Sequence, residues 1–302
     1  MFIVVAKALS ETKGRNVTIA FVLSGGASLG ALQVGMLQAL LEQGVEPDFV
    51  VGTSAGAINA AYFSKSPTLA GLDSLAGLWL GMKRSDVFPV RPALGFLGFV
   101  GKRDHLCPSG PVLSLLRSQY GDQRLEDSPV PAHVIAADLA SGKEVCISTG
   151  PSAEAVLASA SLPGIFPPVK IDGRLLIDGG VINNAPISHA VRLGATKIYV
   201  LACGHACALP KPPTGALGVV LQSVSVLIGR QLVHDVDRFE PHHDLRIVPQ
   251  ICPLDVAPMD FSQAKRLITS AYSSTRSWLQ NTNLGEDQPR LGKSTAIEPH
   301  SH

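Results

Sequence analysis

Residues 49–61 read FVVGTSAGAINAA, an apolar run followed by Gly-x-Ser-x-Gly and then by small residues. This order predicts a buried strand, a sharp turn at Ser54 and a helix. Gly52 and Gly56 flank the serine, and their missing side chains relieve crowding around a strained backbone. The Ser54 hydroxyl is then expected above the edge of a sheet, at the positive end of a helix. We interpret Ser54 as a nucleophile; the alternative is a turn with only a structural role.

Short apolar runs alternate with helical patterns along much of the chain. Further buried strands are predicted at residues 17–23, 132–137 and 197–202. Helices are predicted at residues 30–43, 216–239 and 260–279. Strands that alternate with helices are typical of a mostly parallel sheet covered on both faces. The predicted fold class is therefore α/β, with three layers in the order α/β/α.

The predicted organisation is one core with additions at both ends. Residues 1–16 form an N-terminal extension, and residues 17–208 form the catalytic core. Residues 209–280 are expected to add helices packed on that core, and residues 281–302 to form a flexible tail. The apolar stretch at residues 215–229 is interrupted by polar residues and is too short to span a membrane. We expect this stretch to be a buried helix.

Composition narrows the classes of function. Charged residues make up 16% of the chain and hydrophobic residues 46%, whereas ordinary domains carry roughly 25% charged residues. Such a chain is too apolar for disorder to be its main state. Its net charge of +1 offers no basic face for nucleic acid, so that partner is excluded.

The cysteines and the N-terminus bear on the compartment. An odd number of cysteines suits reduced thiols, and the N-terminus lacks the basic segment of a secretory signal. The expected location is therefore cytoplasmic. Cys203-Gly-His205-Ala-Cys207 contains ligand types, but no second ligand pair follows at zinc-finger spacing. We expect buried thiols there, with no metal and no cofactor.

A glycine-rich loop, VLSGGASLG at residues 22–30, joins the first strand directly to a helix. Ala27 breaks the Gly-x-Gly-x-x-Gly pattern of dinucleotide sites, and no lysine follows Gly30 as a phosphate loop requires. This loop and the serine turn both follow parallel strands, so they are expected at the same edge of the sheet. We therefore interpret the backbone N–H groups of Gly25, Gly26 and Ala27 as an oxyanion hole.

The stretch RLLIDGGVINNAP, residues 174–186, is a short apolar strand that ends at Asp178 and continues into Gly179 and Gly180. A carboxylate held there and partly buried gains proton affinity and can act as a base. An aspartate before glycine also commonly bonds its own backbone in a turn. The local sequence leaves the catalytic base and the turn residue as equal alternatives.

Together the three motifs resemble the patatin-like phospholipase family in its bacterial type. The resemblance covers about residues 18–203, with Gly-Thr-Ser-Ala-Gly at 52–56, Asp-Gly-Gly-Val-x-Asn-Asn-x-Pro at 178–186, and the stretches 137–142 and 158–168. It implies a catalytic dyad of Ser54 and Asp178 without histidine, and an oxyanion hole in the loop 25–30. The implied activity is hydrolysis of fatty-acyl esters in lipids, of the phospholipase A type.

The glycine loop departs from the family at two positions. Ala27 replaces a third glycine, and Leu29 stands where many members have arginine or lysine. Because no lysine or arginine lies between Arg15 and Lys65, the site suits a neutral ester better than a nucleotide. Loss of the loop cation affects phosphate recognition more than acyl chemistry. A general carboxylesterase or lipase, and a catalytically silent lipid-binding scaffold, are therefore the alternatives.

Four histidines follow Asp178 in the chain order of an ordinary Ser-Asp-His triad. They are His189, His234, His242 and His243. The alternative interpretation is that they are ordinary surface or core histidines.

The run between Arg91 and Lys102 is glycine-rich, apolar and free of charge. Its largest side chains are Phe96, Leu97 and Phe99. Such a run with cations at both ends suits a mobile lid or a peripheral membrane-contacting loop. A packed core loop is the alternative.

Overall fold

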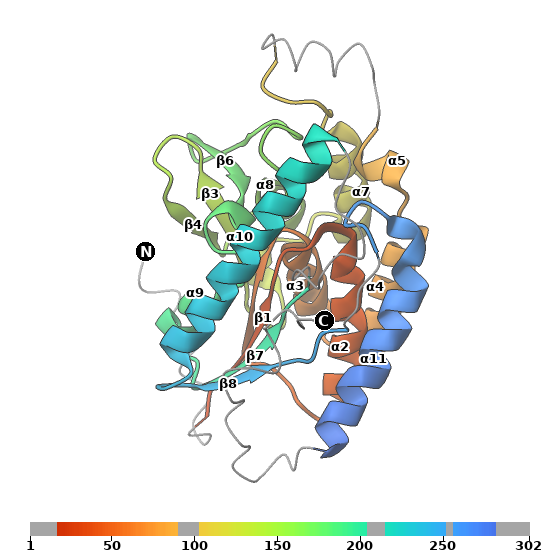
Figure 1. Ribbon diagram of the computed structural model, residues 1–302, viewed down its shortest axis with the longest axis vertical. Helices are drawn as coiled ribbons and strands as arrows, with labels where there is room; N and C mark the ends of the chain where they lie inside the picture. The colour runs from red at the N-terminus through yellow and green to blue at the C-terminus, as the bar shows by residue number, and fades with distance from the viewer. Residues whose placement is uncertain (1–16, 90–102, 204–214, 252–255, 282–302) are drawn as a thin grey trace.

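The computed structural model of the protein describes residues 17–89, 103–203, 215–251 and 256–281 (Figure 1). The central layer is an eight-stranded sheet in the order β5-β6-β3-β2-β1-β7-β8, with β4 paired to β3. The strands that run parallel to one another are β1 (Ile19–Leu23), β2 (Phe49–Thr53), β3 (Ala132–Asp138), β7 (Lys197–Leu201) and β8 (Asp244–Ile247). Antiparallel pairing joins β3 to β4 (Glu144–Ile147) and β6 (Arg174–Asp178), and β6 to β5 (Val169–Ile171).

Helices lie on both sides of this sheet (Figure 1). One side carries α2 (Ala31–Glu42), α3 (Ala55–Lys65), α4 (Leu69–Gly81), α7 (Gly110–Tyr120), α8 (Ser152–Ser159) and α11 (Ala264–Asn281). The other side carries α9 (Ile187–Arg192) and part of α10 (Ala216–Phe239). The short helices are α5 (Arg84–Val87), η1 (Ala27–Gly30), η2 (Leu125–Asp127), η3 (Gly179–Val181) and η4 (Phe261–Gln263). The predicted three-layer α/β/α fold is therefore confirmed.

The central strand β1 shows how the sheet separates two hydrophobic cores. Phe21 and Leu23 belong to the larger core on the α2 side. Ala20 and Val22 belong to the smaller core on the α9 side. Because successive side chains of a strand point to opposite faces, a strand covered on both faces must be apolar at every position. This explains why the predicted strands are unbroken apolar runs.

Helix α10 has the predicted bounds, but the expectation that residues 215–229 are buried is wrong. Val220 and Leu227 are 57% and 67% exposed. Among the described α10 residues, the contribution to the core begins at Leu232. The helical period predicts a helix, but it cannot predict how much of the helix the sheet is long enough to cover. No helix within the described residues is long and apolar enough to cross a membrane.

Several predictions fall on residues that the structure does not describe. They concern residues 1–16, the loop with Phe96, Leu97 and Phe99, the segment 204–214, and the tail beyond Asn281. The chain before that tail packs closely on the core, because α11 lies along α2 (Figure 1). Gly35 permits the close approach of these two helices, since a Cβ there would collide with the Ile268 carbonyl oxygen.

Candidate active site

Ser54 occupies a sharp turn between β2 and α3, at the carboxyl edge of the parallel strands. Its backbone has φ 55° and ψ −122°, a conformation that residues with a side chain rarely adopt. Gly52 and Gly56 leave room for this turn. A Cβ at Gly52 would collide with the Gly56 carbonyl oxygen, and one at Gly56 with the Leu23 carbonyl oxygen. The two glycines therefore let the chain reverse directly beneath the serine.

The Ser54 hydroxyl meets the carboxylate of Asp178. Ser54 Oγ donates to Asp178 Oδ2 at 2.6 Å, and the Gly180 N–H donates to Asp178 Oδ1 at 2.7 Å. Strands β2 and β6 both pair with β3, so the two side chains approach each other across that strand. Only 1% of Asp178 and 9% of Ser54 are exposed. The structure thus brings together two residues 124 positions apart in the chain.

Burial sets the proton affinity of the carboxyl group. Desolvation raises the pKa of Asp178 to about 6, although the hydrogen bonds from Ser54 and Gly180 oppose that rise. The carboxylate is therefore mostly ionised at neutral pH, yet it holds a proton much more readily than a solvated aspartate does. This is the property required of a general base that takes a proton from a hydroxyl.

The predicted histidines do not join this pair. Within the described part of the chain, the hydrogen-bond partner of Ser54 Oγ is Asp178. His189 Nδ1 instead lies 3.1 Å from Glu144 Oε1. The backbone N–H groups of His242 and His243 both donate to the Phe239 carbonyl oxygen, and the His243 ring contacts the Phe239 ring. The triad arrangement is thus absent from the described residues.

The glycine loop between β1 and α2 passes beside the serine. A Cβ on Gly25 would lie 3.0 Å from Ser54 Cβ. The Gly25 N–H donates to the Asn184 carbonyl oxygen at 3.1 Å, so that N–H already has an acceptor. Among the described residues, the N–H groups of Gly26 and Ala27 have no acceptor. Ala27 has φ 50°, so its backbone is also strained.

A buried polar network that the sequence analysis missed holds this loop. Gln33 Nε2 donates to the carbonyl oxygens of Ser24 and Leu201, at 2.9 and 2.8 Å. Asn59 Nδ2 donates to Gln33 Oε1 and to the Gly30 carbonyl oxygen, at 2.7 and 2.9 Å. Trp79 Nε1 completes the network by donating to Asn59 Oδ1 at 2.8 Å. A signal was present, because Gln33 and Asn59 are polar residues within apolar helices.

The sequence analysis also missed the role of Ser159. The Ser54 N–H donates to Ser159 Oγ at 2.8 Å, and Ser159 Oγ donates in turn to the Ile135 carbonyl oxygen at 2.5 Å. Its position within the stretch 158–168, which carries part of the family resemblance, was the available signal. The Ser54 N–H is therefore engaged by the protein.

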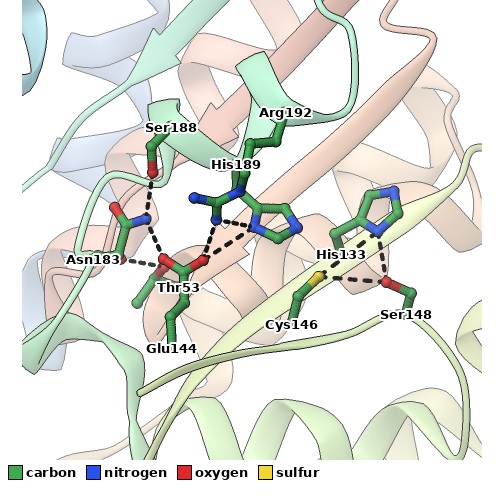
Figure 2. A network of polar contacts seen from close by, with 9 residues as sticks. All are labelled: Thr53, His133, Glu144, Cys146, Ser148, Asn183, Ser188, His189 and Arg192. Carbon is green, nitrogen blue, oxygen red and sulfur yellow. Dashed lines mark hydrogen bonds and ion pairs between the residues drawn. The ribbon is translucent and has the colours of Figure 1, made fainter. Parts of the chain in front are cut away.

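On the far side of the sheet, a second polar network supports the same loops (Figure 2). Thr53 Oγ1 donates to the Asn183 carbonyl oxygen at 2.9 Å, and Asn183 Nδ2 donates to Glu144 Oε2 at 2.5 Å. Glu144 also contacts His189 and Arg192. Burial alone would raise the pKa of Glu144, but hydrogen bonds from His189 and Asn183 and the Arg192 charge lower it to about 2. An ionised Glu144 thus anchors the segment after Asp178.

The same neighbourhood contains Cys146, whose sulfur lies 3.4 Å from Ser148 Oγ and 4.0 Å from His133 Nδ1 (Figure 2). Burial would raise the pKa of Cys146, but hydrogen bonds with His133 and His189 lower it to about 6. Burial would lower the pKa of His189, whereas its contacts with Cys146 and Glu144 raise it to about 9. This network includes Thr53, the residue before Ser54, but the described hydrogen bond of Ser54 Oγ goes to Asp178, outside the network.

Comparisons with known proteins place the chain in a family. The family model for patatin-like phospholipases matches residues 21–191, more than half of the chain. Patatin-like phospholipase domain-containing protein 7 of Rattus norvegicus is 31% identical over 195 residues, which cover 62% of this chain and 14% of the rat protein. The uncharacterized NTE family protein Rv1063c of Mycobacterium tuberculosis is 28% identical over 171 residues, which cover 56% of this chain and 44% of that protein. The match therefore spans less than half the length of each relative.

Two solved structures align with most of the chain at low sequence identity. VipD from Legionella pneumophila aligns with a TM-score of 0.46 and 15% identity, over 88% of this chain and 67% of that one. Human GIVD cytosolic phospholipase A2 aligns with a TM-score of 0.41 and 13% identity, over 92% of this chain and 61% of that one. The family assignment rests on the sequence match, and the chain belongs to the patatin-like phospholipase family.

Proposed function

We propose that the protein is a serine hydrolase that cleaves fatty-acyl esters of lipids, phospholipids included. Ser54 is the nucleophile and Asp178 the base. The observation that carries the proposal is the 2.6 Å hydrogen bond between Ser54 Oγ and Asp178 Oδ2 at a strained strand-to-helix turn. A buried carboxylate and a strained serine both cost stability, and such costs concentrate at functional sites.

The proposed reaction begins when Ser54 Oγ attacks an ester carbonyl and Asp178 accepts the hydroxyl proton. The N–H groups of Gly26 and Ala27 then bind the oxyanion of the tetrahedral intermediate. We assign two donors rather than the three expected, because the Gly25 N–H is bonded to Asn184. The departing alcohol takes the proton from Asp178, and water hydrolyses the acyl-enzyme with Asp178 acting as base again.

The proposed substrate is the neutral acyl ester group rather than a particular phosphate headgroup. Leu29, at the position where many family members carry a cation, is 4% exposed and belongs to the larger core. Its side chain therefore offers no charge to a headgroup. A general carboxylesterase or lipase remains the second candidate for the same reason, and hydrolysis of a panel of phospholipids, triglycerides and simple esters distinguishes the two.

Covalent labelling and turnover test the proposal together. A fluorophosphonate probe is expected to label the wild-type protein but not Ser54→Ala, and Ser54→Ala is expected to lose at least about a thousandfold in turnover of a soluble short-chain ester. Asp178→Asn should approach the same loss, because the amide cannot accept the proton. Ser64→Ala is a matched control, since Ser64 is another buried serine, near the far end of α3, and its hydroxyl donates to the Ala61 carbonyl oxygen.

Two outcomes would contradict this assignment. Full turnover by purified Ser54→Ala would show that another group performs the reaction. A wild-type protein that neither turns over esters nor reacts with the probe would favour the catalytically silent lipid-binding scaffold.

A further inference from the structure

Helix α10 presents a group of exposed apolar side chains. Five of them, here called the α10 apolar face, are 39–67% exposed: Val219, Val220, Val224, Val226 and Leu227. Their spacing of three, four and seven residues places them on neighbouring rows along one side of the helix. Ser223 lies among them, and its hydroxyl donates to the Val219 carbonyl oxygen at 2.9 Å. The serine that lies among these five residues therefore uses its hydrogen-bonding capacity within the helix.

No described part of the protein covers this face. Described α10 residues enter a hydrophobic core only from Leu232 onward. In Figure 1 the helix crosses the front of the molecule, with its N-terminal half at the top. Contiguous exposed apolar patches on soluble proteins commonly mark sites of interaction with a partner or a membrane. The α10 apolar face is therefore a candidate site for such an interaction.

The length and direction of α10 place its apolar face on the same side of the molecule as Ser54. The helix follows β7 and returns to the start of β8, and both strands are parallel to β2, which leads into Ser54. Its 24 residues extend for about 36 Å, whereas the five-residue strand β7 extends for about 17 Å. The N-terminal half of α10 must therefore project beyond the carboxyl edge of the sheet. A broad surface that contacts the N-terminal half of α10 therefore also faces the edge of the sheet that carries Ser54.

Side-chain chemistry identifies the occupant. The α10 apolar face is entirely aliphatic, whereas the centres of interfaces between proteins are enriched in Tyr, Trp, Phe, Met and Arg. No aspartate or glutamate occurs between Asp178 and Asp235, and Arg230 is exposed three residues beyond Leu227. An apolar helix face with a flanking cation and no acidic residue suits the acyl and headgroup layers of an anionic lipid surface.

We propose that the α10 apolar face binds the surface of a lipid bilayer and so presents the Ser54 edge to its substrate. The choice of a lipid surface rests on the proposed function. The surface proposal predicts that binding to lipid and turnover of a soluble ester depend on different residues.

Vesicle co-sedimentation measures the binding directly. The vesicles contain phosphatidylcholine and phosphatidylglycerol, and every protein carries Ser54→Ala so that hydrolysis does not alter the lipid. Val220→Ser with Leu227→Ser is expected to weaken partitioning at least about tenfold, because two aliphatic side chains no longer enter the interface. The matched control is Val17→Ser with Leu69→Ser, another exposed valine and leucine, 42% and 45% exposed. Both lie at the opposite edge of the sheet, so unchanged partitioning is expected.

Two further measurements separate this proposal from its alternatives. With Ser54 intact, the Val220→Ser, Leu227→Ser protein should turn over a soluble short-chain ester like the wild type. If the wild-type protein hydrolyses nothing but still binds vesicles through this face, the proposed function fails and the surface assignment stands. Equal vesicle binding by both double variants, or no binding by the parent protein, overturns the surface assignment. A dimer in size-exclusion chromatography that the Val220→Ser, Leu227→Ser change abolishes also overturns it, because the face then joins two copies.

Discussion

Replacement of Asp178 by asparagine should increase stability at neutral pH while it removes activity. Asp178 is buried, and its pKa is raised from 3.8 to about 6. The raised value means that the folded protein binds the proton more tightly than the unfolded chain. Ionisation therefore destabilises the fold, with no effect below pH about 4 and the full effect above pH about 6. The difference between the two pKa values corresponds to about 3 kcal/mol at pH 7.

An asparagine can keep both local hydrogen bonds with their directions adjusted. Its oxygen can accept from the Gly180 N–H, as Asp178 Oδ1 does now, and its NH₂ group can donate to Ser54 Oγ. The variant therefore loses mainly the buried charge. Urea unfolding of both proteins at several pH values between 4 and 7 measures the difference in the free energy of unfolding. Between pH 4 and pH 7, we expect the free energy of unfolding of Asp178→Asn to rise by about 3 kcal/mol relative to that of the wild type.

The wild-type pH–rate profile provides an independent measure of the same group. Because the base must be ionised, kcat/KM for a soluble ester should fall as the pH drops below about 6. A difference in the free energy of unfolding that stays constant from pH 4 to 7 would refute the reasoning. So would a kcat/KM that falls only below pH 4, since the carboxyl group would then have the pKa of a solvated aspartate.

Three other substitutions test the supports of the site. Asn59→Leu leaves the Trp79 N–H without its acceptor and should lower the free energy of unfolding by about 2–4 kcal/mol. A fall in kcat/KM is expected with it, and urea unfolding that matches the wild type would contradict the prediction. Gly56→Ala drives a Cβ into the Leu23 carbonyl oxygen and should lower the melting temperature by several degrees or abolish folding. An unchanged melting temperature would mean that the turn at Ser54 has room for a side chain at this position. Glu144→Gln should cost about 3 kcal/mol at pH 7, because the pKa of Glu144 is lowered from 4.5 to about 2. This stability is present above pH 4.5 and is lost as the pH falls toward 2, so an equal cost at pH 2 and pH 7 would refute it.

Local patterns in the chain were sufficient to predict the elements around the site. The apolar runs predict β1, β2, β3 and β7 to within two residues at each end, because strands buried on both faces must be apolar throughout. The helix predicted at residues 216–239 has those bounds. The turn at Ser54 was predictable for a related reason, since its strained backbone requires small neighbours at fixed spacing.

Contacts between distant segments were beyond such patterns. The local sequence left Asp178 as a base or a turn residue. The structure shows that Asp178 accepts the turn hydrogen bond from the Gly180 N–H and also lies 2.6 Å from Ser54 Oγ, so the turn contact does not compete with the proposed role as base. The loss of the Gly25 N–H to the Asn184 carbonyl oxygen could not be foreseen, because the two residues meet only when the strands are assembled.

The sequence alone determined the α/β class, the strand-to-helix turn that carries Ser54, and Asp178 as a candidate base, since each depends on residue types at short spacing. The tertiary structure alone decided that the two residues meet across β3 and that Gly26 and Ala27 keep their N–H groups open among the described residues. It also decided that the first half of α10 extends past the cores. Burial and hydrogen-bond satisfaction depend on which surfaces the folded chain brings together, and neighbours in sequence do not carry that information.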